Sequence, residues 1–380
     1  MNGLAHKLQR RTRLRVGFDA RWYNDSGVGA YVAGLARAMS EMQDSVELVL
    51  YENSGNPVPL PTNGQAERIP VSAKKYSVAE QIELARRCRE DRLDLFHSPF
   101  YIVPLLASCP VVVTFHDLMP FLFPIYSVAK RSLVQSGYRM AARKATHIIA
   151  DSERTAYDIE KILRFERRRV SVVHLAAAEC FSTVAAEGEQ EFLKQKDGIQ
   201  LPYMLVAASR NQPTKNVDTA FRVLERVRQS GVQFQAVVFG PAEALAPAEG
   251  SSLNIIRTGY VPAAELAMMY RHATAFLLPS LYEGFGLPLV EAMSCGCAVV
   301  ASTGGALPEV AGAGAQLFDP HDVPGMAGAL FRLLREPEHL TRWREAACLR
   351  SREFFWKRAA EKTIRVYHQC AKNSSSQAVS

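Results

Sequence analysis

The sequence has little that would support a disulfide framework, a zinc site or a membrane span. Its seven cysteines are an odd number, widely scattered, and no Cys-x-x-Cys pair occurs, so neither a set of disulfides nor a zinc site is indicated. The closest pair, Cys295-Gly296-Cys297, is typical of small buried thiols beside a helix end. No uninterrupted apolar run reaches about 18 residues, which excludes a membrane-spanning helix.

The amino terminus has no apolar stretch of the kind that a secretory signal requires, although residues 1–15 carry five basic side chains. We therefore expect a cytoplasmic protein. The net charge of +7 and the pI near 9.0 suit an anionic partner, whether a nucleotide, a lipid diphosphate, a membrane surface or nucleic acid. Because the basic residues are not interleaved with aromatics as in nucleic-acid-binding motifs, we expect no nucleic-acid partner.

What is present is an alternation of short apolar runs with helical stretches, which predicts parallel α/β units. With 380 residues, 48% of them hydrophobic, the chain can bury two cores. We predict two Rossmann-like, doubly wound domains, residues 1–185 and 186–355, followed by a C-terminal segment, 356–380. The polar segment 176–200 is predicted to be the linker, and 338–371 a long helix.

The predicted elements lie on both sides of this linker. Strands are expected at 14–18, 46–51, 93–97, 111–115, 146–150 and 170–174, then at 203–207, 235–239, 254–256, 275–278, 298–301 and 316–318. Helices are expected at 30–42, 79–90, 126–144 and 153–163, the last of these capped by Asp151-Ser152.

The motif with the clearest chemistry is Pro279-Ser280-Leu281-Tyr282-Glu283-Gly284-Phe285-Gly286-Leu287-Pro288-Leu289-Val290-Glu291. It follows an apolar strand and opens a helix, whose first turn suits Pro288. The glycines permit close approach of a ligand, and the free amides of the first turn attract an anion. Glu283 and Glu291 can accept hydrogen bonds from hydroxyl groups. A ligand with both phosphates and hydroxyls, such as a nucleotide-sugar, fits; the alternative is an ordinary helix start with solvated charges.

These residues resemble a family of retaining glycosyltransferases with the GT-B fold, family 4. Its signature is two glutamates with seven residues between them and a Gly-Phe-Gly in that interval, as at Glu283 and Glu291. The resemblance extends over essentially the whole chain, to Gly259-Tyr260-Val261, to 304–310 and to His116-Asp117-Leu118. It implies that the C-terminal helix crosses back to the first domain.

On the donor side, the resemblance implies specific roles. Glu283 would hold hydroxyls of the donor sugar, amides around Phe285, Gly286 and Leu287 would support the sugar and phosphates, and Glu291 would bind the ribose. Gly305 and its neighbours in 304–307 resemble a second turn over the diphosphate. Lys215 resembles the lysine that neutralises the leaving diphosphate, with Arg210 as its partner, one residue closer than expected.

In the first domain, Gly27 and Gly29 follow the first strand and would let the helix start approach the phosphates, although Ala30 replaces a basic residue common in relatives. His116, at a strand end, matches a histidine near the reacting centre. His97 is also at a strand end; it is either functional or a core histidine.

The resemblance favours bacterial mannosyltransferases and hence GDP-mannose as donor. The expected reaction is metal-independent hexosyl transfer with retention, needs no cofactor beyond the nucleotide-sugar, and uses a glycan or lipid-linked glycan as acceptor. Alternatives are a UDP-sugar-dependent transferase, an inverting transferase and a sugar-nucleotide epimerase. A basic region, with Lys130, Arg131, Arg139, Arg143 and Lys144 and with Arg164 and 167–169, is either a peripheral contact with anionic membrane or a solvated face.

Overall fold

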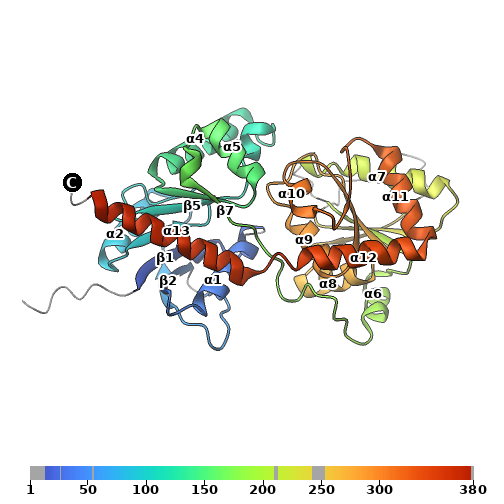
Figure 1. Cartoon of the computed structure of the whole chain (residues 1–380), viewed down its shortest axis with the longest axis horizontal. Helices are drawn as coiled ribbons and strands as arrows, with labels where there is room; N and C mark the ends of the chain where they lie inside the picture. Colours follow the sequence, from blue (N-terminus) through green and yellow to red (C-terminus); the bar gives the residue numbers. More distant parts are fainter. Residues whose placement is uncertain (1–12, 26, 54, 209–212, 242–252, 378–380) are drawn as a thin grey trace, which may run out of the picture.

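The computed structural model describes residues 13–377 apart from 26, 54, 209–212 and 242–252. It contains two parallel β-sheets, each flanked by helices, side by side along the long axis of the molecule (Figure 1). The predicted α/β fold with two doubly wound domains is confirmed.

The first sheet has the strand order β3-β2-β1-β4-β5-β6-β7. Its strands are β1 Leu14–Asp19, β2 Val46–Asn53, β3 Glu67–Val71, β4 Leu95–Ser98, β5 Val111–Phe115, β6 His147–Ala150 and β7 Val170–Val172. β4, β5 and β6 are buried throughout, as expected for strands covered on both faces. The strand order changes direction between β1 and β4, and the region beyond the carboxyl ends of the strands at such a point is the usual ligand position in open sheets.

The second sheet has the order β10-β9-β8-β11-β12-β13. Its strands are β8 Tyr203–Ala207, β9 Gln235–Phe239, β10 Asn254–Gly259, β11 Ala275–Leu278, β12 Ala298–Ser302 and β13 Gln316–Phe318. Here the direction changes between β8 and β11, which places the loop that contains Lys215 beside the loop that contains Glu283.

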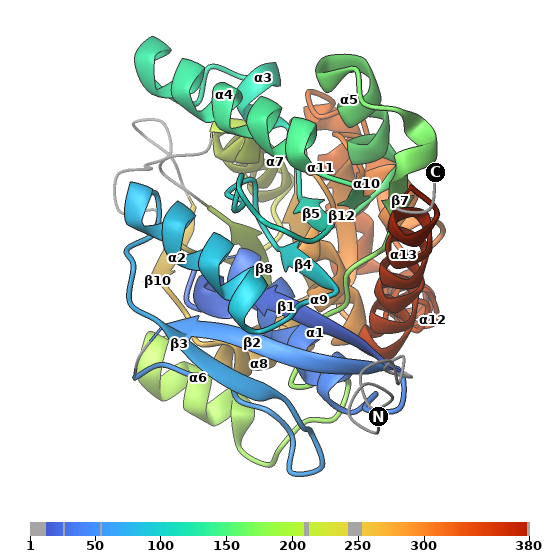
Figure 2. The ribbon, with the colours of Figure 1, turned by 90° about the vertical axis from the view of Figure 1, so that its left-hand side faces the viewer.

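Helices cover both sheets (Figures 1 and 2). Around the first sheet they are α1 Val28–Ser40, α2 Val78–Glu90, α3 Met119–Leu122, α4 Val128–Lys144 and α5 Glu153–Leu163, with short 3-10 turns η1 Ala20–Trp22 and η2 Arg167–Arg169. Around the second they are α6 Glu189–Asp197, η3 Pro213–Lys215, α7 Val217–Gln229, α8 Ala263–His272, α9 Leu287–Ser294, α10 Leu307–Ala311, α11 Val323–Arg335 and α12 Pro337–Ser351. Among the described helices, none is long and apolar enough to cross a membrane.

Three features differ from the prediction. The edge strand β3 was not predicted, because Pro70 interrupts its apolar pattern and its residues alternate between exposed and buried. The segment expected to be an irregular linker contains α6, which buries Glu189 and Leu193. The helix predicted over 338–371 is two helices, α12 and α13 Trp356–Gln377.

The C-terminal helix α13 returns to the first domain and packs against α1 (Figure 2). A Cβ atom added to Gly34 in α1 would lie 2.0 Å from the Trp356 ring, so the glycine makes room for that ring. The Tyr367 hydroxyl lies 2.7 Å from His97 Nδ1 at the buried end of β4. The chain therefore crosses from one domain to the other twice, after β7 and again after α12.

Candidate functional site

At the loop after β11, two predicted residues, Lys215 and Glu283, meet the neighbouring Ser280. Lys215 Nζ donates to Glu283 Oε1 at 2.8 Å, and the Ser280 hydroxyl donates to the same oxygen at 2.6 Å. Asn216 fixes the lysine loop, since its amide nitrogen donates to the Pro279 carbonyl at 2.9 Å. The predicted donor-side charges thus meet where the strand order of the second sheet changes direction.

The helix after this loop begins as predicted. Gly286 is the N-cap of α9 with φ of 92°, a conformation that favours glycine, and Pro288 lies in the first turn. No side chain caps α9, so its first amides remain suited to an anion. Burial raises the pKa of Glu291 to about 7, although nearby Lys215 opposes this shift. Phe285 is buried against His174 and Phe354, with ring centroids 5.9 and 5.8 Å away.

The second glycine-containing turn lies directly on the first. A Cβ atom on Gly305 would be 2.2 Å from the Glu283 carbonyl oxygen, and one on Gly304 would be 2.3 Å from that of Ser280. The Ala306 amide donates to the Glu283 carbonyl at 2.9 Å. These glycines therefore allow two loops of the second domain to pack together, and the loop with Gly305 borders the donor-side cluster.

The other residues predicted to contact the donor are Arg210, Gly27 and Gly29. Arg210 lies outside the described residues. Gly27 is the N-cap of α1 with φ of 73° and has no atom within 4 Å of a Cβ position, so its backbone conformation is what requires glycine. A Cβ atom on Gly29 would lie 2.1 Å from the Tyr23 carbonyl oxygen. Gly29 is thus explained by packing of its own turn, and its phosphate contact stays a prediction.

Both nitrogens of His116 are engaged within the first domain. Nδ1 lies 2.6 Å from Asp151 Oδ2, and Nε2 lies 2.9 Å from the Pro99 carbonyl oxygen. Because a carbonyl oxygen only accepts, Nε2 carries a proton, and the carboxylate at Nδ1 favours a second proton and thus the charged ring. Burial opposes this charge, but Asp151 raises the pKa of His116 above its ordinary value. The backbone of His116 lies against the loop after β11. A Cβ atom added to Gly284 in that loop would come within 2.0 Å of the His116 carbonyl oxygen.

The start of α5 joins the two domains through contacts that the sequence did not predict. The hydroxyls of Ser152 and Thr155 donate to the Gly284 carbonyl at 2.6 and 3.1 Å. Glu309 accepts from the Glu153 amide at 2.9 Å, and His174 Nε2 lies 2.7 Å from its other oxygen. The predicted cap is also present, since Ser152 accepts from the Thr155 amide. One helix terminus therefore holds both turns of the donor side.

A further bond across the domains joins the Tyr282 hydroxyl to Asp158 Oδ2 at 2.7 Å. The only sequence signal for these partners was the Asp151-Ser152 cap, which predicted the helix start but not what it contacts. Thr155 and Asp158 carry no motif of their own. Their roles follow from the relative position of the two domains.

His97 is a core histidine rather than a site residue. Its side chain is fully buried, with Nε2 2.9 Å from Thr114 Oγ1 and Nδ1 bonded to Tyr367. Burial lowers its pKa to about 3, so the ring is neutral. Cys295 and Cys297 are buried free thiols, as predicted. Within the described residues, no group of three or more His, Cys, Asp or Glu side chains is placed to hold a metal ion.

Comparison with known proteins agrees with this geometry. The family described as Glycosyltransferase Family 4 matches residues 26–178, and the family described as Glycosyl transferases group 1 matches residues 189–350. The O-antigen chain mannosyltransferase B of Escherichia coli is 26% identical and is covered over 96% of its length, with 91% of this chain. The MMP alpha-(1->4)-mannosyltransferase of Mycolicibacterium hassiacum is 31% identical over 61% of this chain and 56% of its own length.

Solved structures show the same fold. Sucrose-phosphate synthase from Thermosynechococcus elongatus aligns over 94% of this chain and 99% of its own, with a TM-score of 0.73 and 17% identity. Anabaena HepE, solved in complex with UDP-glucose, aligns over 96% of this chain and 100% of its own, with a TM-score of 0.68 and 16% identity. These likenesses confirm the predicted GT-B arrangement of two Rossmann-like domains.

Proposed function

This chain belongs to the family 4 glycosyltransferases of the GT-B fold, and we propose that it transfers a hexose, with retention of configuration, from a nucleotide-sugar to a glycan acceptor. The observation that carries the proposal is the contact of Lys215 and Ser280 with Glu283 beside the uncapped start of α9. A cation, an anion-binding helix terminus and a hydroxyl acceptor are thereby placed side by side. A nucleotide-sugar needs all three.

In the proposed reaction the bond between the sugar C1 and the diphosphate oxygen breaks while a bond from C1 to the acceptor oxygen forms on the same face. The proton of the acceptor hydroxyl passes to the leaving diphosphate. Lys215, Arg210 and the α9 amides stabilise the negative charge that develops on that diphosphate. Glu283 then holds sugar hydroxyls, and Glu291 holds the ribose. No cofactor takes part.

We propose that the reaction needs no divalent ion, because Lys215 and the helix amides supply the positive charge. Transfer should continue at an unchanged rate in excess EDTA. A strong loss of rate in EDTA that magnesium or manganese restores would contradict this part of the proposal.

We propose GDP-mannose as the donor; its sugar is supported by two relatives that are named mannosyltransferases. A thermal-shift panel of GDP, UDP and ADP, each with its hexose derivatives, tests the choice. We expect the largest increase in melting temperature with GDP and GDP-mannose. A larger shift with UDP would favour the alternative, a UDP-sugar-dependent transferase, and conversion of the free nucleotide-sugar to its epimer would favour an epimerase.

A peripheral membrane contact is proposed for the surface of α3 and α4. Val128 and Leu133 are 79% and 74% exposed there, and Lys130 and Arg139 lie over the rings of Tyr126 and Phe121. The basic region available for this contact is smaller than the sequence suggested. Four of its side chains bind partners within their own domain, namely Arg167, Arg168, Arg169 and Lys144.

Co-sedimentation tests this contact with vesicles of phosphatidylcholine alone and with added phosphatidylglycerol. We expect binding only to the anionic vesicles, with a loss in the double variant Lys130→Glu, Arg139→Glu. Equal binding to both kinds of vesicle would argue against the electrostatic part.

A further inference from the structure

Aromatic side chains that the proposed donor site does not use lie on the loops that follow the adjacent strands β1 and β4. Trp22 follows β1, and its ring centroid lies 4.7 Å from that of Phe100, which follows β4. Tyr101 lies 4.3 Å from Phe100, and Tyr76, in the loop before α2, lies 5.7 Å from Trp22 with its ring edge-on. Three loops at one edge of the sheet thus supply four neighbouring rings.

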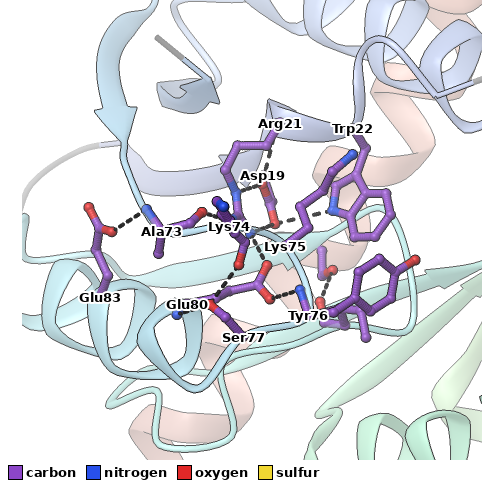
Figure 3. Close-up of polar contacts among 12 residues, drawn as sticks. Asp19, Arg21, Trp22, Ala73, Lys74, Lys75, Tyr76, Ser77, Glu80 and Glu83 are labelled. Carbon is purple, nitrogen blue, oxygen red and sulfur yellow. Dashed lines mark hydrogen bonds and ion pairs between the residues drawn. The ribbon is translucent and has the colours of Figure 1, made fainter. Parts of the chain in front are cut away.

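Beside Trp22 and Tyr76 lies a buried ionic network (Figure 3). Arg21 binds Asp19 through two nitrogens at 2.7 Å each and Glu80 at 2.5 Å, and all three side chains are fully buried. Burying such charges costs solvation energy that apolar side chains would not lose, so stability alone gives no reason for this network. Its geometric effect is to fix η1 against the start of α2.

The network holds Tyr76 in a strained conformation. The Tyr76 amide donates to Glu80 Oε2 at 2.7 Å, and Tyr76 has φ of 66°, which is unfavourable for a residue with a side chain. Yet the side chain gains little burial from this strain, because Tyr76 is 62% exposed. A buried network that fixes a strained, exposed aromatic residue is typical of a binding surface.

Polar groups lie beside the same rings. Lys75 Nζ lies 4.4 Å from the centre of the Trp22 ring and forms an ion pair with Asp25. Burial raises the pKa of Tyr76, and the neighbouring Tyr101 hydroxyl raises it further, so the Tyr76 hydroxyl stays protonated. Flat apolar faces with donors and acceptors at their edge suit a sugar ring, which has an apolar C–H face and hydroxyls around it.

This surface is continuous with the transfer site. Pro99 and Tyr101 belong to one short loop, and the Pro99 carbonyl accepts from His116. His116 in turn contacts the donor loop at Gly284. A chain of direct contacts therefore leads from Tyr76 through Trp22, Phe100 and the Pro99 loop to the donor side.

We propose that Tyr76, Tyr101, Lys75 and Asp25 form a subsite for a hexose unit of the acceptor glycan, with Asp19, Arg21 and Glu80 as positioning residues. The inference rests on the proposed function and specifies its acceptor. The occupant is an uncharged oligosaccharide, because Lys75 and Asp25 neutralise each other and offer one donor and one acceptor to hydroxyls.

The test compares wild type, Tyr76→Ala and Tyr76→Phe, with Tyr157→Ala as matched control because Tyr157 is a 54% exposed tyrosine on α5. The probe is an α-linked mannotetraose. We expect Tyr76→Ala to raise the KM for this acceptor about tenfold or more, as the loss of an aromatic contact implies. The KM for the donor and the slow hydrolysis of donor without acceptor should remain as in wild type, and Tyr76→Phe and the control should bind the acceptor normally.

Saturation-transfer NMR with the same mannotetraose measures binding without any reaction. The inference predicts signal with wild type and its loss in Tyr76→Ala. An unchanged acceptor KM and an unchanged NMR signal in that variant would overturn it, and so would an absence of signal with wild type. If wild type binds the oligosaccharide but turns over no donor, the proposed function fails and the subsite stands.

Discussion

At the scale of single residues, the donor side is built from charges that neighbouring groups hold in place. Glu283 accepts from both Lys215 and Ser280 through one oxygen, Oε1, which leaves Oε2 to meet a ligand. Lys215 is the only cation that contacts it within the described part of the chain. The pair therefore combines a hydroxyl acceptor with the charge that a diphosphate needs.

Replacing Glu283 with Gln keeps the shape of the side chain and removes its charge. We expect kcat for sugar transfer to fall by about 100- to 1,000-fold, as for other preorganised groups at reacting centres. The melting temperature should stay close to that of wild type. Steady-state kinetics and thermal unfolding measure both, with the exposed Glu187→Gln as control. Wild-type kcat in Glu283→Gln would contradict the assignment.

Glu291 predicts a dependence of stability on pH. Burial raises its folded pKa from 4.5 to about 7, so the folded state retains a proton that the unfolded state releases. The free energy of unfolding contributed by this group is present below pH 4.5 and is lost as pH rises through 7. Glu291→Gln cannot ionise, so it should exceed wild type by about 1–3 kcal/mol at pH 8 and match it near pH 4.5.

Urea unfolding at both pH values measures this difference. A gap of the same size at pH 4.5 and pH 8 would show that Glu291 does not titrate as described.

The residues that the sequence predicted are those that carry a local pattern. Glu283 and Glu291 were found from the motif that they frame, and Lys215 from its resemblance to the family's lysine. The contacts between the domains were not predictable, because Tyr282 lies far from Asp158 in the chain, as Glu309 does from His174, and each pair meets only when the two domains face each other. Likewise, His97 and His116 were both predicted at a strand end. No local pattern shows that His97 is the one that belongs to the core.

At the scale of elements, the start of α5 and the loop after β11 form the contact between the domains. Gly284 is at its centre, with its carbonyl bound by Ser152 and Thr155 and its Cα close to the His116 backbone. Elements were predictable where apolar periodicity is strong, as in β5 and α5. They were missed where it is weak: β3 is interrupted by Pro70, and α6 buries only Glu189 and Leu193.

Gly284→Ala tests this contact. Its Cβ would lie 2.0 Å from the His116 carbonyl oxygen, so the domains would have to separate. We expect kcat to fall by about 100-fold through misplacement of the reacting groups, while the Kd for GDP, which we propose to bind the second domain, stays nearly unchanged. Isothermal titration and kinetics measure the two effects.

Gly328→Ala in α11 is the matched control, because an added Cβ there meets no atom within 4 Å. Activity at the wild-type level in Gly284→Ala would exclude this domain contact from the working enzyme.

At the scale of the whole molecule, the C-terminal helix α13 packs on the first domain. Tyr367, His97, Thr114 and Tyr31 form a buried series of hydrogen bonds from α13 through the first sheet to α1. The sequence predicted a helical tail but not its division, because residues 352–355 separate α12 from α13 without a proline or glycine. That break is where the chain crosses between the domains.

Tyr367→Phe removes one hydroxyl from this series and leaves His97 Nδ1 without its partner. We expect the free energy of unfolding to fall by about 1–3 kcal/mol, the cost of an unsatisfied buried group. Tyr157→Phe, at an exposed tyrosine, should have little effect. Equal stability of the two variants in urea would contradict the role given to Tyr367.

The most direct test of the central proposal is proton NMR of GDP-α-mannose incubated with wild type and a mannotetraose acceptor. We predict that the anomeric signal of the donor decays while GDP and a new α-mannosyl signal appear, and that Glu283→Gln slows both changes by about 100-fold or more. A β-linked product would contradict retention. A donor that wild type leaves intact in this mixture, and in parallel mixtures with UDP- and ADP-sugars, would contradict glycosyl transfer at this site.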